Sequence, residues 1–436
     1  MSERGRDPGP EADGERSVTG RASASAPAEH GEAGARAVIT GLGIAAPNGL
    51  GTEECWRSTL AGTSGIGPIS RFDASGYPVR LAGEVTGFEV AAHVPSRLVP
   101  QTDRMTQLAL AAADWALADA GVDPQRFDDF EMGVVTANSS GGFEFGQREL
   151  EQLWANGPQY VSAYQSFAWF YAVNTGQLSI RHGMCGPSGV TVAEQAGGLD
   201  ALGQARRQLS KGIRLVLTGG MDASLCPWGL VAQLPSGLLS EQPDPQRAFL
   251  PFDTAASGQV LGEGGAILVM EPAAAARERG APHLYGEIAG YCATFDPRPG
   301  SGRPSRLLGA MRGALDAAGL TADEVDVVFA DASGVPESDR AEAGAITALF
   351  GPRGVPVTVP KTMFGRLSSG GAPVDVALAL LALRDGVIPP SVNITAPVEE
   401  YRLDLVTEAR PARLRTALVV ARGAGGFNTA LVVRSI

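Results

Sequence analysis

Cysteine and histidine are scarce in this 436-residue chain, which contains four of each. The cysteines follow no regular spacing, which excludes a disulfide framework and a thiolate zinc site: Cys55, Cys185, Cys226 and Cys292. Positive charge is also in short supply, because 35 Lys and Arg residues face 47 Asp and Glu residues, for a net charge of −12. A general nucleic-acid or anionic-membrane binder would need a basic surface, so both classes are excluded.

Long apolar runs are absent as well. No uncharged apolar segment reaches the roughly 18 residues of a membrane-spanning helix, and residues 1–36 lack the apolar core of a signal peptide. Together with the scattered cysteines, this predicts a cytoplasmic protein. The hydrophobic content of 44% indicates one large or two fused globular units.

The composition changes abruptly at Arg36. Residues 1–35 contain Gly, Pro, Ser, Ala and mixed charges but almost no large apolar side chain, which predicts a disordered tail. After it, strand candidates such as 132–138 and 214–220 alternate with helix candidates such as the Ala-rich stretch 103–120. This alternation predicts parallel sheets with helices on their faces.

The order of the expected elements repeats along the chain. Residues 36–275 and residues 276–436 show a similar succession of strands and helices, although no sequence repeat is visible by eye. We therefore expect two similar α/β halves packed against each other. Two unrelated α/β domains are the alternative.

Five separated sequence blocks carry a family resemblance. In chain order they are GPSGVTVAEQAGGLDAL, PFD followed by GEGGAILV, VFADASGVPESDRAEAGAI, VPKTMFGRLSSGGAPVDVA and ARGAGGFNTALVV. They resemble the signature blocks of β-ketoacyl synthases of the thiolase superfamily. They are similar in detail to one branch, the chain length factor, which is the ketosynthase beta subunit of type II (aromatic) polyketide synthases. The resemblance implies a thiolase-like α/β fold with a layered α-β-α-β-α core.

The branch is indicated by the catalytic residues that are missing. A condensing ketosynthase needs a cysteine at a strand-to-helix turn, where the helix N-terminus stabilises the thiolate. The matching residue here is Gln195, and an amide cannot form an acyl-enzyme. The two catalytic histidines of the family correspond to Asp331 and Arg366, and Asp339 and Glu342 match later acids of the family. No histidine lies in the C-terminal third of the chain: the four are His30, His93, His182 and His283.

Two roles for Gln195 stay open. Ketosynthase-like domains with glutamine at this position decarboxylate a malonyl group, and the amide would orient the thioester. Those domains keep both histidines, which this chain lacks. The alternative is a structural plug, in which neighbouring backbone groups satisfy the amide at the helix start.

Lys361 keeps the lysine of the family's second histidine block. Only one other lysine, Lys211, occurs among the 35 basic residues. Because a lone buried charge costs several kcal/mol, we predict that Lys361 pairs with Asp331 or Glu342 in a partly buried network that replaces the catalytic dyad. A solvated loop lysine is the alternative.

A predicted helix near 143–154 carries the residues that the resemblance links to product length. Phe143, Gly146 and Leu150 have the spacing i, i+3, i+7 and share one helical face. In chain length factors the matching face closes the end of the channel that receives the growing polyketide. Glycine costs about 1 kcal/mol of helix stability relative to alanine, so Gly146 indicates space for a longer chain, on the order of ten or more acetate units. A fraying helix start with ordinary core residues is the alternative.

Three further features have weaker implications. Trp228, in the segment CPWG, is expected to add a wall to the same interface. The glycine runs 262–265 and 423–426 lack the form of phosphate loops and predict packing turns. A basic run at a helix end either meets an acidic carrier protein or is a solvated face: Arg206, Arg207, Lys211 and Arg214. With a net charge of −12, carrier-protein docking is expected to fall mainly to the partner subunit.

The resemblance implies a noncatalytic subunit in an obligate heterodimer with an active ketosynthase alpha subunit. It would shape the channel and set the length of a poly-β-ketone chain built from malonyl units on an acyl carrier protein. No metal or organic cofactor is expected, because the phosphopantetheine arm arrives on the carrier protein. Two alternatives stay open: a malonyl decarboxylase that primes chains through Gln195, and a scaffold without a channel role. The starter unit, the product and the identity of the partner cannot be read from the sequence.

Overall fold

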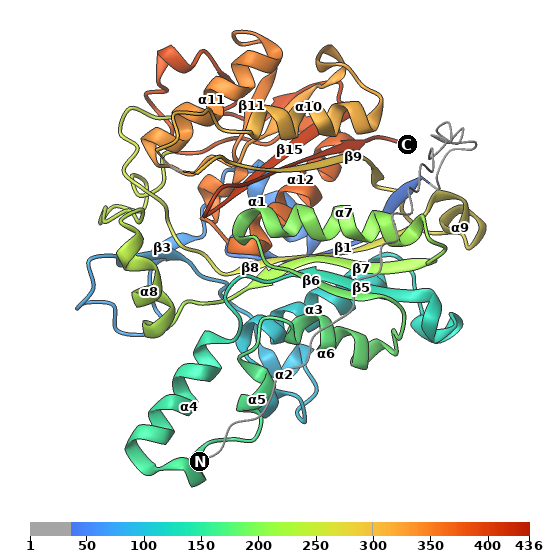
Figure 1. Cartoon of the computed structure of the whole chain (residues 1–436), viewed down its shortest axis with the longest axis vertical. Coiled ribbons are helices and arrows are strands. Elements are labelled where there is room, and N and C mark those ends of the chain that lie inside the picture. Colours follow the sequence, from blue (N-terminus) through green and yellow to red (C-terminus); the bar gives the residue numbers. More distant parts are fainter. Residues whose placement is uncertain (1–35, 299) are drawn as a thin grey trace, which may run out of the picture. The chain divides into compact units, whose positions relative to one another are not determined.

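Twelve of the strands form one sheet that consists of two halves (Figure 1), and two smaller sheets of the described residues contain two strands each. The structure is a computed structural model that describes residues 36–298 and 300–436, and contacts join these residues into one unit. The disordered tail predicted for residues 1–35 lies outside the described residues. Among the helices of the described residues, none is long and apolar enough to cross a bilayer.

The first half has the spatial strand order β1-β8-β7-β5-β6. β1 pairs antiparallel with β8 and β8 pairs antiparallel with β7, whereas β7, β5 and β6 run parallel. The bounds of these strands are β1 Ala37–Ala46, β5 Met132–Ala137, β6 Ser188–Thr191, β7 Leu215–Asp222 and β8 Gly264–Pro272.

The second half repeats this arrangement with the order β9-β16-β15-β10-β11. Its first two pairings are antiparallel and the remaining ones are parallel, as in the first half. The bounds are β9 Gly286–Phe295, β10 Val327–Phe329, β11 Pro356–Thr358, β15 Thr416–Gly423 and β16 Phe427–Arg434, with β13 Asp404–Leu405 at the edge. The predicted pair of similar α/β halves is therefore confirmed.

The prediction of parallel sheets is wrong for part of each half. β15 and β16 are joined by the short turn at 424–426, and a turn of this length can connect only antiparallel neighbours. The two halves meet where β1 pairs antiparallel with β9 over two residue pairs, with Val38 opposite Glu287 and Ile39 opposite Gly286.

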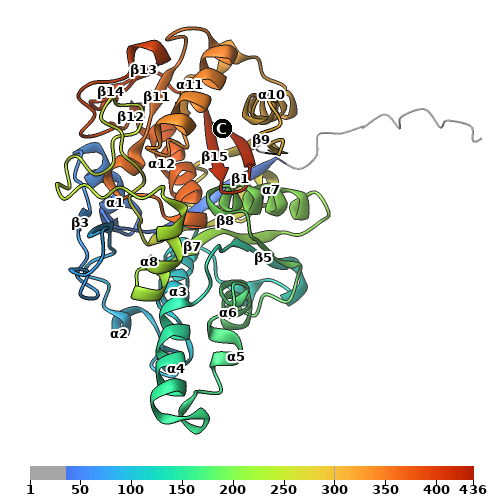
Figure 2. The same cartoon turned by 60° about the vertical axis from the view of Figure 1, so that its left-hand side comes forward.

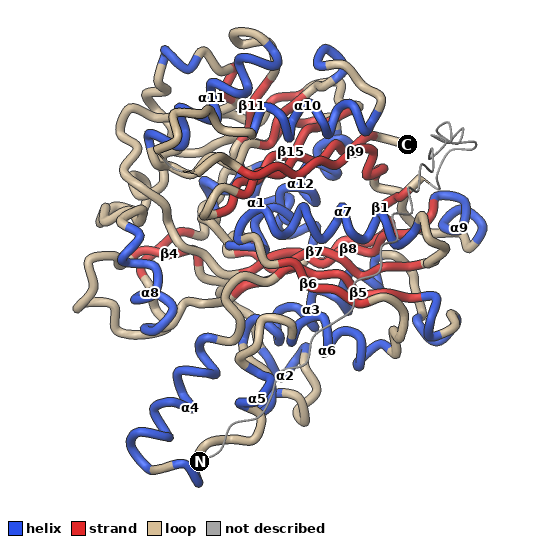
Figure 3. The backbone as a smooth tube through the Cα atoms, in the orientation of Figure 1, coloured by secondary structure: helices blue, strands red, loops and turns tan. Residues whose placement is uncertain are grey.

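Helices form three layers around the two halves of the sheet, as Figure 1 and the turned view in Figure 2 show. α7 (Gly197–Leu209) and α12 (Gly371–Asp385) lie between the halves. α3 (Arg104–Asp119) and α6 (Val173–His182) cover the outer face of the first half, and α10 (Leu307–Ala318) and α11 (Pro336–Phe350) cover that of the second. The layered α-β-α-β-α core is also visible in the backbone trace of Figure 3.

Smaller elements complete the described chain. The short helices are α1 Thr52–Leu60, α2 Val90–His93, α5 Gln165–Ala168, α8 Pro227–Gln233 and α9 Ala273–Glu278. The short strands are β2 Gly49–Leu50, β3 Ile66–Pro68, β4 Leu81–Gly83, β12 Val387–Ile388 and β14 Arg410–Pro411.

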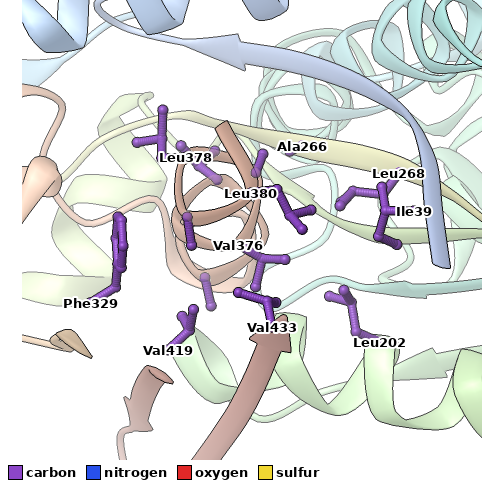
Figure 4. Close-up of a cluster of buried hydrophobic side chains, with 14 of the residues drawn as sticks. Ile39, Leu202, Ala266, Leu268, Phe329, Val376, Leu378, Leu380, Val419 and Val433 are labelled. Carbon is purple, nitrogen blue, oxygen red and sulfur yellow. The ribbon is translucent and has the colours of Figure 1, made fainter. Parts of the chain in front are cut away.

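The largest buried cluster surrounds α12. Apart from Asp375, this helix is apolar from Gly371 to Leu383, and every residue of that stretch is buried, as expected for a helix enclosed on all sides. Its Val376 and Leu380 lie among side chains of both halves, including Ile39 of β1 and Val433 of β16 (Figure 4). One shared core therefore holds the two halves together.

α4 (Phe143–Asn156) extends away from the layers, and α5 lies beside it (Figures 1 and 2). Large apolar side chains that are 38–82% exposed gather on this region: Leu150, Trp154, Tyr160, Tyr164, Trp169, Phe170 and Tyr171. Such a concentration of exposed aromatic rings is typical of a protein–protein interface.

Candidate functional site

The turn between β6 and α7 presents Gln195 at the start of a buried helix. A short 3-10 turn, Glu194–Ala196, connects the two elements, and Glu194 adopts a positive φ of 51°. The Gln195 side chain is buried, and a Cβ at Gly371 would lie 2.7 Å from its Oε1 atom. The amide is thus enclosed between the first turns of α7 and α12.

Asp331 and Arg366 form a buried ion pair. Arg366 Nη1 lies 3.1 Å from Asp331 Oδ2, and Nη2 lies 3.3 Å from Oδ1, so both ends of the guanidinium meet the carboxylate. The same guanidinium donates to the backbone oxygens of Asp331 and Arg422. Both side chains are nearly inaccessible to solvent, at 3% and 4% exposure. Because a guanidinium keeps its proton at physiological pH, this pair cannot exchange a proton as an imidazole does.

Three further carboxylates lie around this pair, and their pKa values respond to burial. Burial and, to a smaller extent, the nearby Asp331 charge raise the pKa of Glu342 to about 7. Burial also raises the pKa of Asp339 to about 6 and that of Glu194 above its ordinary range, although Arg366 opposes the shift at Glu194. Backbone N–H groups stabilise these carboxylates, since those of Asp331 and Ala332 donate to Glu342 at 2.7 and 2.8 Å.

The Lys361 ammonium pairs with Asp375, which corrects the predicted pairing with Asp331 or Glu342. Lys361 Nζ lies 2.6 Å from Asp375 Oδ2 and donates to the backbone oxygen of Ala330 at 2.6 Å. Lys361 is 2% exposed, so the alternative of a solvated lysine is also wrong. Asp375 lies in the same sequence block as Lys361, but the sequence does not show that the first turns of α12 bring its carboxylate back to the ammonium. Arg366 pairs with Asp331, which is one of the two carboxylates predicted for Lys361.

A polar cavity of about 290 Å³ lies over this centre. Its walls include Glu194, Asp331, Arg366 and Arg422, together with the glycine-rich turn at 423–426. Glu194 Oε2 accepts a hydrogen bond from the backbone N–H of Ala424 at 3.0 Å and so fastens this turn to the start of α7. The glycine run therefore forms a packing turn beside the centre, as predicted.

At the base of α4, the structure brings Phe143 and Gly146 together with Trp228 from α8. The rings of Phe143 and Trp228 have their centroids 4.7 Å apart. A Cβ at Gly146 would lie 2.9 Å from Trp228 Cζ3 and 3.6 Å from the Cβ of Trp169. The Trp228 ring therefore packs on Gly146 and fills the space beside it. Leu150 is 38% exposed, one helical turn farther along α4.

Asp222, at the end of β7, connects the base of α4 with the region of the central helices. Its carboxylate accepts hydrogen bonds from the backbone N–H groups of Ser139, Ser140 and Ser369, and from the Asn138 side chain. Burial raises the pKa of Asp222 to about 6. Sequence reasoning missed this residue, because its two partner segments, at 138–140 and at Ser369, become its neighbours only in the folded chain.

Two family models match this chain. The N-terminal domain of β-ketoacyl synthases matches residues 35–276, and the C-terminal domain matches residues 285–395. Together they cover most of the chain.

Curated relatives and solved structures agree with the family models. The chain is 63% identical to the tetracenomycin polyketide synthase ketoacyl synthase beta subunit of Streptomyces glaucescens, over 91% of this chain and 98% of that protein. It is 59% identical to the actinorhodin polyketide putative beta-ketoacyl synthase 2 of Streptomyces coelicolor, again over 91% and 98%.

Among solved structures, the ishigamide ketosynthase/chain length factor superposes with a TM-score of 0.85 at 28% identity, over 93% of this chain and 100% of that chain. The structure of a type II PKS acyl-carrier protein in complex with its ketosynthase, bound to the hexaketide, superposes with a TM-score of 0.83 at 25% identity over the same shares.

Proposed function

Because this chain belongs to the β-ketoacyl synthase family, in the branch of type II ketosynthase beta subunits, we propose that it shapes the polyketide channel of a heterodimer and does not condense malonyl units itself. The observation that carries this proposal is the Asp331–Arg366 ion pair beside the buried Gln195. Condensation needs a thiolate and proton-carrying groups at these positions. An amide and a doubly bonded guanidinium supply neither.

The partner in this proposal is an active ketosynthase alpha subunit. The exposed aromatic side chains of α4 and of residues 160–171 support it, because they form an apolar surface that a partner subunit would bury. In the same proposal, Phe143, Gly146, Leu150 and Trp228 close the end of the channel, and the partner's cysteine performs the condensation. The acyl carrier protein delivers malonyl units on its phosphopantetheine arm, and no metal or further cofactor takes part.

Coexpression with an active ketosynthase tests this assembly directly. We expect the affinity-tagged chain to elute with the untagged ketosynthase as a one-to-one heterodimer, because an isolated chain would leave the α4 aromatic surface in water. Native mass spectrometry after one affinity step gives the stoichiometry. A stable homodimer, or a monomer that does not bind the ketosynthase, would contradict the proposal.

A second test concerns Gln195. We expect the Gln195→Ala heterodimer to decarboxylate malonyl carrier protein as fast as the wild type, because the amide is enclosed at the start of α7, beside an ion pair without a mobile proton. The release of labelled carbon dioxide measures the rate. A clear loss in the variant, with the heterodimer intact, would instead support the priming decarboxylase.

A further inference from the structure

A groove of about 590 Å³ lies on the second half of the chain, between the end of β9 and the start of α10. Three guanidinium groups line it, from Arg303, Arg306 and Arg312, and all three residues are exposed. None of the described residues that line the groove is an aspartate or a glutamate. This concentration of positive charge stands out on a chain with a net charge of −12.

The groove has an apolar floor next to its charges. Phe295 lines it with its ring 57% exposed, and Leu308 lies on α10 one turn before Arg312. Phe295 is held in place by Phe427, because the two rings meet edge to face with centroids 5.1 Å apart. Cations around an exposed aromatic ring are the pattern of a protein-binding surface rather than of a merely solvated one.

Hydrogen bonds that Asp296 accepts fix the shape of this groove. Its Oδ1 atom accepts from the Ser305 hydroxyl at 2.9 Å, from the backbone N–H of Arg306 at 2.7 Å and from Asn428 Nδ2 at 2.8 Å. The Asp296 carboxylate therefore joins the loop to β16, and Arg303, Arg306 and Arg312 form no ion pair within the described part of the chain.

The groove adjoins the cavity over the Asp331–Arg366 pair. Phe295 lines the groove, whereas its neighbour Asp296 and its ring partner Phe427 line the cavity. A ligand seated on the arginines would thus lie beside the site where an active ketosynthase carries its catalytic residues.

We propose that this groove, defined by Phe295, Arg303, Arg306 and Arg312, docks the acidic surface of the acyl carrier protein on this subunit. The proposal rests on the function proposed above, which brings the carrier protein to the heterodimer. Acyl carrier proteins are acidic, and charge complementarity steers such partners and fixes their register. The expectation that docking falls mainly to the partner subunit would then need revision.

Charge reversal tests the groove in the intact heterodimer. We expect Arg306→Glu/Arg312→Glu to raise the dissociation constant for malonyl carrier protein about tenfold at low salt, with a smaller effect at high salt. The matched control, Arg57→Glu/Arg277→Glu, makes the same charge change at exposed residues of α1 and α9 and should leave the constant unchanged. Fluorescence anisotropy with labelled carrier protein provides the constants.

A cross-linking experiment locates the contact. A photo-reactive benzoylphenylalanine at Phe295 should capture the carrier protein, whereas the same group at the 75% exposed Phe130 should not. Equal capture at both positions would overturn the proposal. So would a dissociation constant for the groove variant within twofold of the control variant. The native mass of each variant shows whether the heterodimer still forms. An intact heterodimer without docking at the groove would contradict only this proposal, whereas a missing heterodimer in the wild type would contradict the proposed function.

Discussion

Replacing Lys361 with methionine is expected to lower the free energy of unfolding by about 3–5 kcal/mol, because it leaves Asp375 buried without its cation. The Oδ1 atom of Asp375 already has no hydrogen-bond partner among the described residues. Urea unfolding of the heterodimer at fixed concentration measures the loss. The effect is large because both ionic side chains are almost fully buried, at 2% and 1% exposure.

The loss should depend on pH. Burial already raises the pKa of Asp375 to about 6 against the opposing effect of Lys361, and removing the ammonium raises it further. The folded variant then binds a proton that the unfolded chain releases, so its stability rises as the pH falls toward 5 and declines at pH 8. A pH-independent loss would show that packing, not charge, accounts for it.

Two matched variants complete this test. Lys211→Met removes the chain's other lysine, which is exposed at the end of α7, and should change stability by less than about 0.5 kcal/mol. Lys361→Met/Asp375→Leu removes both charges and should recover most of the loss, because an apolar pair can replace a buried ion pair. If Lys361→Met alone is as stable as the wild type, the pair has no structural role.

Substituting Gly146 with leucine is expected to shorten the polyketide product by at least one two-carbon unit. A Cβ at this position already comes within 2.9 Å of Trp228 Cζ3, so the larger side chain must displace the ring. The Phe143 ring packs on Trp228 and would move with it. Both shifts reduce the space at the proposed end of the channel. Mass spectrometry of the products made by the reconstituted heterodimer gives the chain length.

Three comparisons make this result specific. Gly344→Leu places the same change on the exposed face of α11, where a Cβ meets no atom within 4 Å, and should leave the length unchanged. Gly146→Leu/Trp228→Ala removes the indole ring that the leucine would displace, so it should restore products longer than those of Gly146→Leu. Gly146→Ala is the milder variant if leucine prevents assembly. An unchanged length with all Gly146 variants would mean that this face does not limit the chain, as the scaffold alternative holds.

Much of the fold follows from local patterns. The predicted helix at 103–120 is observed as Arg104–Asp119 with Asp103 as its N-cap. Periodicity and capping act over a few residues, so the sequence displays them directly. The direction of β8 and β16 could not be predicted in this way, because it depends on how the returning strand inserts between distant neighbours.

In the candidate centre, too, the sequence predicts the identity of the residues, whereas only the fold shows which of them come into contact. The family resemblance matches Gln195, Asp331 and Arg366 to a cysteine and two histidines, and this prediction needs only the sequence, because folding does not change which side chain a position carries. The pairing of the remaining charges could not be read, since Lys361 and Asp375 meet only after α12 packs between the two halves.

By itself, the sequence determined the family of this chain, the existence of its helices and strands, and the helical face that carries Phe143 and Gly146. Only the tertiary structure decided which carboxylate neutralises Lys361, that Trp228 rests on Gly146, and that three arginines share one groove. The physical reason is the range of the forces involved. Backbone propensities act between near neighbours in sequence, whereas ion pairs and ring contacts act between near neighbours in space.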